Sequence, residues 1–282
     1  MSRTQTRGRR RRRRRRNPAL RGAIVAVLCL ALAGGGAFGA VRAVGMVKTS
    51  QQRKLRTEGE KKLESGDYSG ALTDFETAIE SLNKDTGALA LDLLCWRAEA
   101  EYRLEDYEAA LHTYELLMER DEKETDYVYL AALTNAALGN DDEALALYNQ
   151  AKQSDGKKKE DTVQERALDA VTAILAKAGR ADEAVALYQE SMGENPDGKK
   201  YLQMAVYQMD GENYDSASLL LDQAESFAGE DEELKKEVAY TRAVLSEYRL
   251  DFSGALEQFR SYVATYGEDE RAQHEITFLE SR

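Results

Sequence analysis

The sequence predicts an all-α protein built from a repeated helix pair, and three observations carry that prediction. Only two of the 282 residues are proline, and the composition favours Ala, Leu, Glu, Lys and Arg, which lose least on entering a helix. A pattern of small and aromatic residues recurs six times along residues 52–269. Its copies begin 33 to 40 residues apart, which is the length of one helical hairpin.

Residues 1–22 form a basic tail in front of an acidic body. Arg9–Arg16 are eight consecutive arginines, and residues 1–48 hold 13 of the 39 basic residues and no Asp or Glu. The remaining 26 basic residues stand against all 51 acidic ones, so residues 49–282 carry a net charge of −25. Such a body repels phosphate backbones, which argues against nucleic acid as its partner.

Residues 23–47 are expected to form a transmembrane signal-anchor helix. Ala23–Val41 is nineteen residues long without one charge, and at about 1.5 Å rise per residue it covers close to the ~30 Å hydrocarbon core. Because the basic residues precede the span, the positive-inside rule places residues 1–22 in the cytoplasm and the body across the membrane. We therefore expect a single-pass protein of a bacterial cell membrane with an extracytoplasmic body.

Other interpretations of this segment stay open. A cleaved signal peptide has the same order of regions, and Ala37-Phe38-Gly39 offers small residues at the −3 and −1 positions of a peptidase site. A lipoprotein is disfavoured, since Leu28 precedes Cys29 where a small residue is expected. The arginine run also fits a nucleic-acid patch or nuclear signal, although its place beside an apolar span favours a topogenic role.

The body repeats one motif. It has an aromatic residue near a turn, then a small residue, and four residues after the small residue an aromatic ring or a leucine. The first copy reads Gly66-Asp67-Tyr68, Ala71, Phe75 and Ala78. Small residues let two helices approach, and the larger residue fills the gap made by the next pair. The later copies place these two residues at Ala110 and Tyr114, Ala144 and Tyr148, Ala184 and Tyr188, Ala217 and Leu221, and Ala255 and Phe259.

This pattern resembles the tetratricopeptide repeat, whose unit of about 34 residues is a pair of antiparallel helices. The resemblance implies a right-handed α-α superhelical solenoid of about six helix pairs over residues 48–269. A transmembrane helix would precede it and a capping helix at 270–282 would close it. The family's small residue in the first helix is matched by Gly59, Ala98, Ala132, Thr172, Ala205 and Ala243. The expected repeats span residues 52–85, 91–124, 125–158, 165–198, 198–231 and 236–269.

No constellation typical of an active site is legible in the sequence. His112 and His274 lie far apart, and neither has a partner at metal-ligand spacing. There is no Ser/His/Asp or Cys/His arrangement and no phosphate-binding glycine loop. Cys95 is expected to be a buried structural thiol. We therefore expect a protein that is not an enzyme and that uses no metal and no cofactor.

In tetratricopeptide proteins the first helix of each repeat lines a concave groove, and the resemblance assigns partner binding to that wall. Aromatic anchors within a polar rim suit an extended peptide or a helix. The alternative is that tight packing buries several of these positions as ordinary core. Carried onto this sequence, the groove positions form an apolar, tyrosine-bearing set: Tyr102, Tyr129, Leu133, Leu202, Val206, Met209, Tyr240, Val244 and Tyr248.

The same wall indicates the chemistry of the partner. Relatives that grip a partner's C-terminal carboxylate use Lys, Asn and Arg there, whereas this sequence has residues such as Glu60, Trp96 and Glu99. A basic or apolar segment suits the acidic body better than an acidic tail. We expect a membrane-anchored scaffold that binds a protein or peptide segment and takes no small-molecule substrate. The alternative is an accessory or regulatory subunit of an envelope enzyme or secretion complex.

Overall fold

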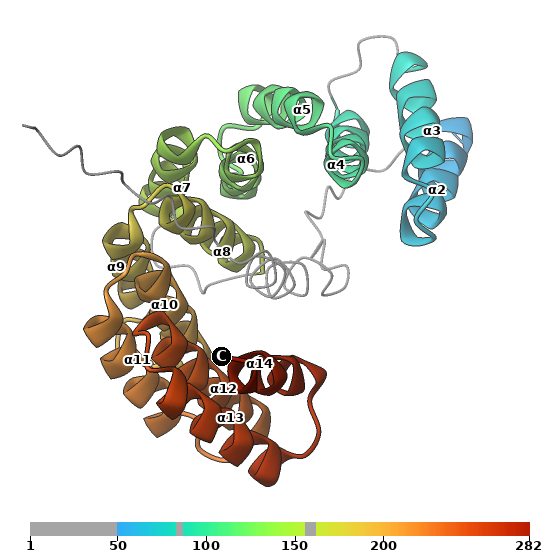
Figure 1. Cartoon of the computed structure of the whole chain (residues 1–282). Helices are drawn as coiled ribbons and strands as arrows, with labels where there is room; N and C mark the ends of the chain where they lie inside the picture. The colour runs from blue at the N-terminus through green and yellow to red at the C-terminus, as the bar shows by residue number, and fades with distance from the viewer. Residues whose placement is uncertain (1–49, 83–86, 156–161) are drawn as a thin grey trace, which may run out of the picture. The chain divides into compact units, whose positions relative to one another are not determined.

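The computed structural model describes residues 50–82, 87–155 and 162–282, and the regular elements within them are all α-helices (Figure 1). The expected basic tail and the expected anchor helix at 23–47 lie outside these residues. In the part of the chain that is described, no helix is both long and apolar enough to cross a membrane.

Thirteen helices occur in the described residues, and all but the last are joined consecutively as hairpins. They are α2 (Ser50–Glu64), α3 (Tyr68–Glu80), α4 (Ala88–Arg103), α5 (Tyr107–Arg120), α6 (Thr125–Leu138), α7 (Asp141–Asp155), α8 (Thr162–Lys177), α9 (Ala181–Met192), α10 (Gly198–Asp210), α11 (Tyr214–Ser226), α12 (Glu232–Tyr248), α13 (Phe252–Tyr266) and α14 (Glu270–Glu280).

Each helix packs mainly against its neighbours along the chain. The two helices of every hairpin contact each other, and the second helix of each hairpin contacts the first helix of the next. First helices also meet across hairpins, as α6 does with α8 and α10 with α12. Such nearest-neighbour packing is typical of repeat proteins, whose stability is a sum of terms from each unit and its interfaces.

The start of helix α12 depends on a local cap. Helix α12 begins at Glu232, four residues before the expected repeat start at 236. The Asp231 side chain causes the early start, because it accepts a hydrogen bond from the Leu234 backbone N–H and so satisfies one free donor of the first turn.

The recurring small and aromatic residues form the contacts between helices. The six motif alanines, such as Ala71, are completely buried, and the ring or leucine four residues after each of them, such as Phe75, is at most 3% exposed. Helix backbone approaches a ring closely at Gly59 of α2, where an added Cβ would lie 2.5 Å from Phe75 Cε1. A side chain at Gly59 would therefore displace the Phe75 ring.

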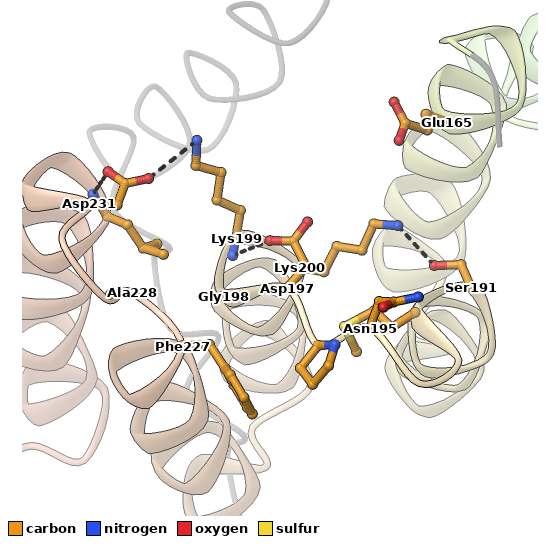
Figure 2. A pocket seen from close by; sticks show the side chains of 13 residues that line it. Glu165, Ser191, Asn195, Asp197, Gly198, Lys199, Lys200, Phe227, Ala228 and Asp231 are labelled. Carbon is orange, nitrogen blue, oxygen red and sulfur yellow. Dashed lines mark hydrogen bonds and ion pairs between the residues drawn. The ribbon is translucent and has the colours of Figure 1, made fainter. Parts of the chain in front are cut away.

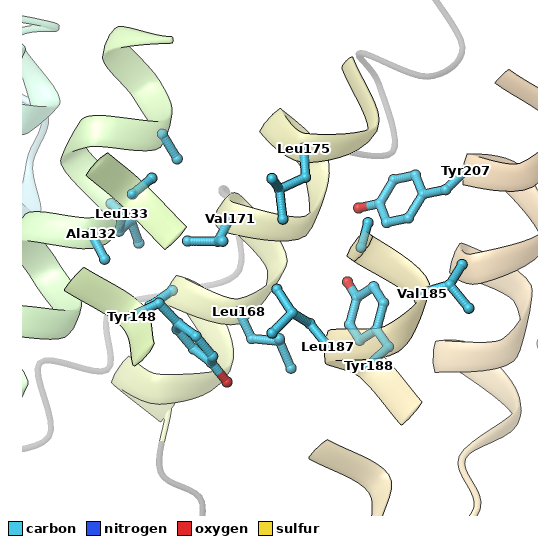
Figure 3. Packing of buried hydrophobic residues seen from close by; sticks show 14 of the residues in the cluster. Ala132, Leu133, Tyr148, Leu168, Val171, Leu175, Val185, Leu187, Tyr188 and Tyr207 are labelled. Carbon is cyan, nitrogen blue, oxygen red and sulfur yellow. The ribbon is translucent and has the colours of Figure 1, made fainter. Parts of the chain in front are cut away.

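A continuous apolar cluster joins five helices in the middle of the described chain (Figure 3). Its side chains come from α6, α7, α8, α9 and α10. Helix α8 contacts each of the other four and contributes Leu168, Val171 and Leu175. The central hairpins therefore share one core instead of having separate cores.

Each hairpin turn places one residue in the left-handed backbone region, directly before the second helix is capped. In three turns this residue is glycine, and in the other three it carries a side chain. The side chain then clashes with its own backbone, at a cost of about 1–2 kcal/mol. The six positions are Gly66, Gly139 and Gly179, with φ of 86°, 88° and 87°, and Glu105, Glu212 and Leu250, with φ of 61°, 61° and 64°.

Replacing Leu250 by glycine is expected to raise the free energy of unfolding by about 0.5–1 kcal/mol. The change removes the backbone clash, and the larger entropy of glycine in the unfolded chain offsets part of that gain. Leu250 is exposed, so little packing is lost. Urea unfolding followed by circular dichroism measures the change.

The matched control is Leu104→Gly, since Leu104 is also an exposed turn leucine but has φ of −80°. This control should lose stability. Equal gains in both variants would contradict the assignment of strain to Leu250.

Candidate functional site

Three of the nine predicted groove residues are core residues in the structure. Tyr129, Leu133 and Met209 are 0%, 1% and 4% exposed, so they offer no surface to a partner. The other predicted residues are half-buried. They are Tyr102, Leu202, Val206, Tyr240, Val244 and Tyr248.

Two of the buried groove positions, Tyr129 and Leu133, lie on helix α6. Ten of its 14 residues are buried, and the helix contacts α5, α7 and α8. The Tyr129 ring lies 5.6 Å from the Tyr148 ring of α7, and Leu133 belongs to the same cluster as α8. The alternative interpretation, in which packing between repeats buries groove positions, therefore describes α6.

Helices α10 and α12 bring most of the remaining residues together. Leu202, Val244 and Tyr248 pack against the apolar cluster shared by α10, α11 and α12. Tyr240 and Val244 pack against the next cluster, shared by α12, α13 and α14. Val206 follows Leu202 by one turn on α10. These five residues are called the α10–α12 strip below.

Tyr102 stands apart from the α10–α12 strip. It packs against the cluster of α6–α10, and its ring lies 5.1 Å from the Tyr107 ring. Burial raises the pKa of the Tyr102 phenol to about 12, so the group is neutral at ordinary pH. The described contacts do not join Tyr102 to the other five residues.

Helix α14 flanks one end of the strip, a role that the sequence analysis did not foresee. The Arg271 guanidinium lies 4.5 Å from the centre of the Tyr240 ring. The same group donates two hydrogen bonds to Glu237 of α12, at 2.7 and 3.2 Å. Burial raises the pKa of Tyr240 to about 12, and the charge of Glu275 adds to the shift. Tyr240 is thus a neutral aromatic surface held between two helices.

Glu247 of α12 is a further residue of interest that sequence reasoning missed. Its Oε1 atom is buried and has no hydrogen-bond partner. Burial raises the pKa of its carboxyl, the charge of Glu275 adds to this shift and Arg282 opposes it, and the resulting pKa is about 7. The sequence feature that could have indicated Glu247 is its place as an acidic residue between the apolar positions Val244 and Tyr248.

A polar cleft of about 460 Å³ lies where the first turns of α10 and α12 meet the ends of α9 and α11 (Figure 2). Its two lysines are engaged by neighbours. Lys199 lies 3.4 Å from the Asp231 carboxylate, and the Lys200 ammonium donates to Ser191 Oγ at 3.2 Å. The Asp197 carboxylate accepts from the Lys199 backbone N–H at 2.8 Å. These contacts make the cleft a polar joint between hairpins.

Within the described residues, no group of three or more His, Cys, Asp or Glu side chains is placed to hold a metal ion. The two histidines of the chain lie on different helices, His112 on α5 and His274 on α14. His112 lies 3.9 Å from Glu115, one turn along its own helix.

Cys95 is a buried thiol on α4. Its Sγ lies 3.6 Å from the Tyr127 hydroxyl, and burial raises its pKa to about 12.

We expect the folded protein to resist iodoacetamide at pH 8, with Cys95 alkylated at least about tenfold more slowly than in denaturant, because the thiolate is the reacting species. Peptide mass spectrometry of a Cys29→Ser variant measures this rate. Equal rates in folded and unfolded protein would contradict the burial.

The sequence matches no family model and no curated protein. Solved structures do match. The apo form of RapI aligns with a TM-score of 0.62 at 14% identity, over 85% of this chain and 78% of that one. PilW, a widely conserved type IV pilus biogenesis factor, aligns with a TM-score of 0.58 at 15% identity, over 80% of this chain and 99% of that one.

A third structure carries the repeat in its name. A tetratricopeptide repeat protein from Parabacteroides merdae aligns with a TM-score of 0.55 at 16% identity, over 93% of this chain and 94% of that one. Identities this low establish a shared fold and nothing further. The chain therefore has the helical-repeat fold of tetratricopeptide repeat proteins.

Proposed function

We propose that this chain is a scaffold, not an enzyme, and that it binds a segment of a partner protein on the α10–α12 strip. The observation that carries the proposal is the strip itself. Two tyrosines and three aliphatic side chains lie half-buried on consecutive first helices, which leaves apolar surface available in an otherwise acidic body. Large, half-buried aromatic residues are the usual anchors of protein interfaces.

Charge indicates what kind of segment the strip would take. Residues 49–282 carry a net charge of −25, so a basic or apolar segment meets a favourable field and an acidic one is repelled. Rim charges of this kind act mainly on the rate of association and on the choice of partner.

The proposed location is a cell membrane, with residues 1–22 in the cytoplasm and the helical repeats on the other side. Support comes from the arginine run and the uncharged stretch Ala23–Val41. A reporter that is active on one side of the membrane, fused after Arg282, tests the orientation. Activity on the cytoplasmic side would overturn it.

A second candidate function is an accessory or regulatory subunit of an envelope enzyme or secretion complex. The likeness to PilW, a type IV pilus biogenesis factor, favours this class, because nearly all of that chain aligns with this one. Isolation of one stoichiometric complex that contains an enzyme would support it over a general scaffold.

Site-specific photo-crosslinking tests the binding surface directly. Benzoylphenylalanine at Val206, within the strip, is expected to trap a distinct partner in cells. The same group at Leu219, which is 67% exposed on α11, serves as the matched control. Identical products at both positions, or none at Val206, would refute the assignment.

The trapped partner then allows an affinity measurement. Val206→Lys is expected to weaken binding about tenfold or more, because it places a charge within the strip. A factor of ten corresponds to about 1.4 kcal/mol. Leu219→Lys should leave the affinity unchanged. Titration calorimetry with the purified partner distinguishes the two results.

A further inference from the structure

Four residues of α12 share one face of that helix. Glu237, Tyr240, Val244 and Glu247 follow one another at the three- and four-residue intervals of a single helix face, and all four are half-buried. Two of them, Tyr240 and Val244, belong to the α10–α12 strip. The strip therefore has one acid a turn before Tyr240 and another a turn after Val244.

The first of these acids is paired with an arginine of the chain itself. Arg271 of α14 donates two hydrogen bonds to the Glu237 carboxylate, at 2.7 and 3.2 Å. The same guanidinium lies 4.5 Å from the centre of the Tyr240 ring. Arginine suits such a place, because its planar group pairs with a carboxylate and also packs on an aromatic ring. One end of this face thus shows how a basic side chain binds there.

The second acid, Glu247, has no such partner. Its Oε1 atom is buried and accepts no hydrogen bond, and no ion pair involves its carboxylate within the described residues. Burial raises its pKa, as expected of a carboxyl group that lacks a counter-ion. A half-buried carboxylate loses part of its hydration, and a bound cation would compensate for that loss.

The basic residues around Glu247 are engaged elsewhere. Arg242 and Arg249 donate hydrogen bonds to groups of α11, at distances of 2.7 to 2.9 Å. The charge of Arg282 lowers the pKa of Glu247, but its guanidinium lies 4.3 Å from the Phe252 ring. The remaining basic residues of α12 and α13 pair with acids: Lys235 with Glu232, Lys236 with Asp269, and Arg260 with Glu280.

We propose that Glu247 selects a basic side chain in the segment that binds the α10–α12 strip. An arginine or lysine of the partner would pair with Glu247 as Arg271 pairs with Glu237. The occupant is thus a segment with apolar side chains against the strip and one cation beside Glu247. This inference rests on the proposed function, since it assigns the chemistry of the same surface.

Position distinguishes Glu247 from the many other acids of the body. The net charge of −25 attracts any basic segment, and exposed acids such as Glu257 of α13 add to that general attraction. Ions in solution screen such exposed charges. A pair that forms beside apolar contacts is partly removed from water, so it contributes more to affinity and to the choice of partner.

Selection from a peptide library tests the proposal. The full-length chain in a mild detergent is exposed to a phage-displayed library of random short peptides. Peptides that also bind the Val206→Lys variant are discarded, so the remaining binders depend on the strip. These binders are expected to contain an arginine or a lysine among apolar residues.

The affinity of a selected basic peptide then measures the role of Glu247. Glu247→Gln is expected to weaken binding about tenfold, because the amide keeps the size of the side chain and removes its charge. Replacing the basic residue of the peptide by alanine should cost about tenfold with the unmodified chain and nothing with Glu247→Gln. Glu257→Gln removes the same charge at an exposed position and serves as the matched control. Fluorescence anisotropy measures each affinity.

The outcomes separate this inference from the proposed function. Strip-dependent binders that tolerate Glu247→Gln would overturn the role of Glu247 and leave the strip as a binding surface. An equal loss of the basic peptide and its alanine form in Glu247→Gln would also overturn it, since Glu247 would then support the fold. A library without a single strip-dependent binder would refute the strip itself and the inference with it.

Discussion

Replacement of Leu175 by alanine is expected to lower the free energy of unfolding by about 2–5 kcal/mol. Leu175 is completely buried in the cluster that joins α6 to α10 (Figure 3). Helix α8 contacts four other helices of this cluster, so no single neighbour can move in to close the cavity. A domain of ordinary stability has about 5–15 kcal/mol in total, so the loss is a large part of it. Urea unfolding followed by circular dichroism measures the change.

The same chemical change at the terminal helix provides the comparison. Leu279 is buried on α14, which contacts the rest of the repeats on one side only. Leu279→Ala is expected to loosen α14 locally and to leave the main unfolding transition nearly unchanged, because repeat proteins lose stability unit by unit. If both variants shifted the main transition equally, the described repeats would form one indivisible core.

The sequence predicted the helical architecture because the signal for it is local and repeated. An alanine and a ring four residues apart, such as Ala144 and Tyr148, lie on one face of a helix whatever the rest of the chain does. Both residues are buried in the structure. Six repetitions of the same spacing leave helical hairpins as the consistent interpretation.

The groove positions were harder to predict because they depend on contacts between repeats. Tyr129 and Leu133 occupy groove positions by register, yet α6 packs against α8 so that both become core. Nothing within α6 itself indicates that contact.

In the fifth hairpin, the glycine of the turn does not occupy the left-handed backbone position. The turn of the fifth hairpin contains a glycine, Gly211. In the structure Gly211 has φ of −77°, and the left-handed position falls on Glu212 with φ of 61°. The left-handed residue directly precedes Asn213, the N-cap residue of α11, as Leu250 precedes Asp251 of α13. Cap position predicts this turn better than glycine does.

Replacement of Gly59 by alanine is expected to lower the free energy of unfolding of the first hairpin by about 1–3 kcal/mol. An added Cβ would lie 2.5 Å from Phe75 Cε1 and 2.8 Å from Cζ, so the ring must move. Alanine by itself favours a helix over glycine by about 1 kcal/mol, and the steric clash exceeds that gain. The opposite change in size, Phe75→Ala, is expected to cost about 3–5 kcal/mol through the cavity it leaves.

A double-mutant cycle shows whether these two residues form one contact. Gly59→Ala should be nearly harmless in a Phe75→Leu background, since the shorter side chain no longer reaches the new methyl group, and the coupling should exceed about 1 kcal/mol. Trp96 reports the result, because it is the sole tryptophan of the chain and its ring lies 6.2 Å from that of Phe75. Effects that add to within about 0.5 kcal/mol would mean that the destabilisation has another origin. Strong coupling would instead identify the glycine as the small residue that lets α2 and α3 approach, the same role that alanine has in the second helix of each hairpin.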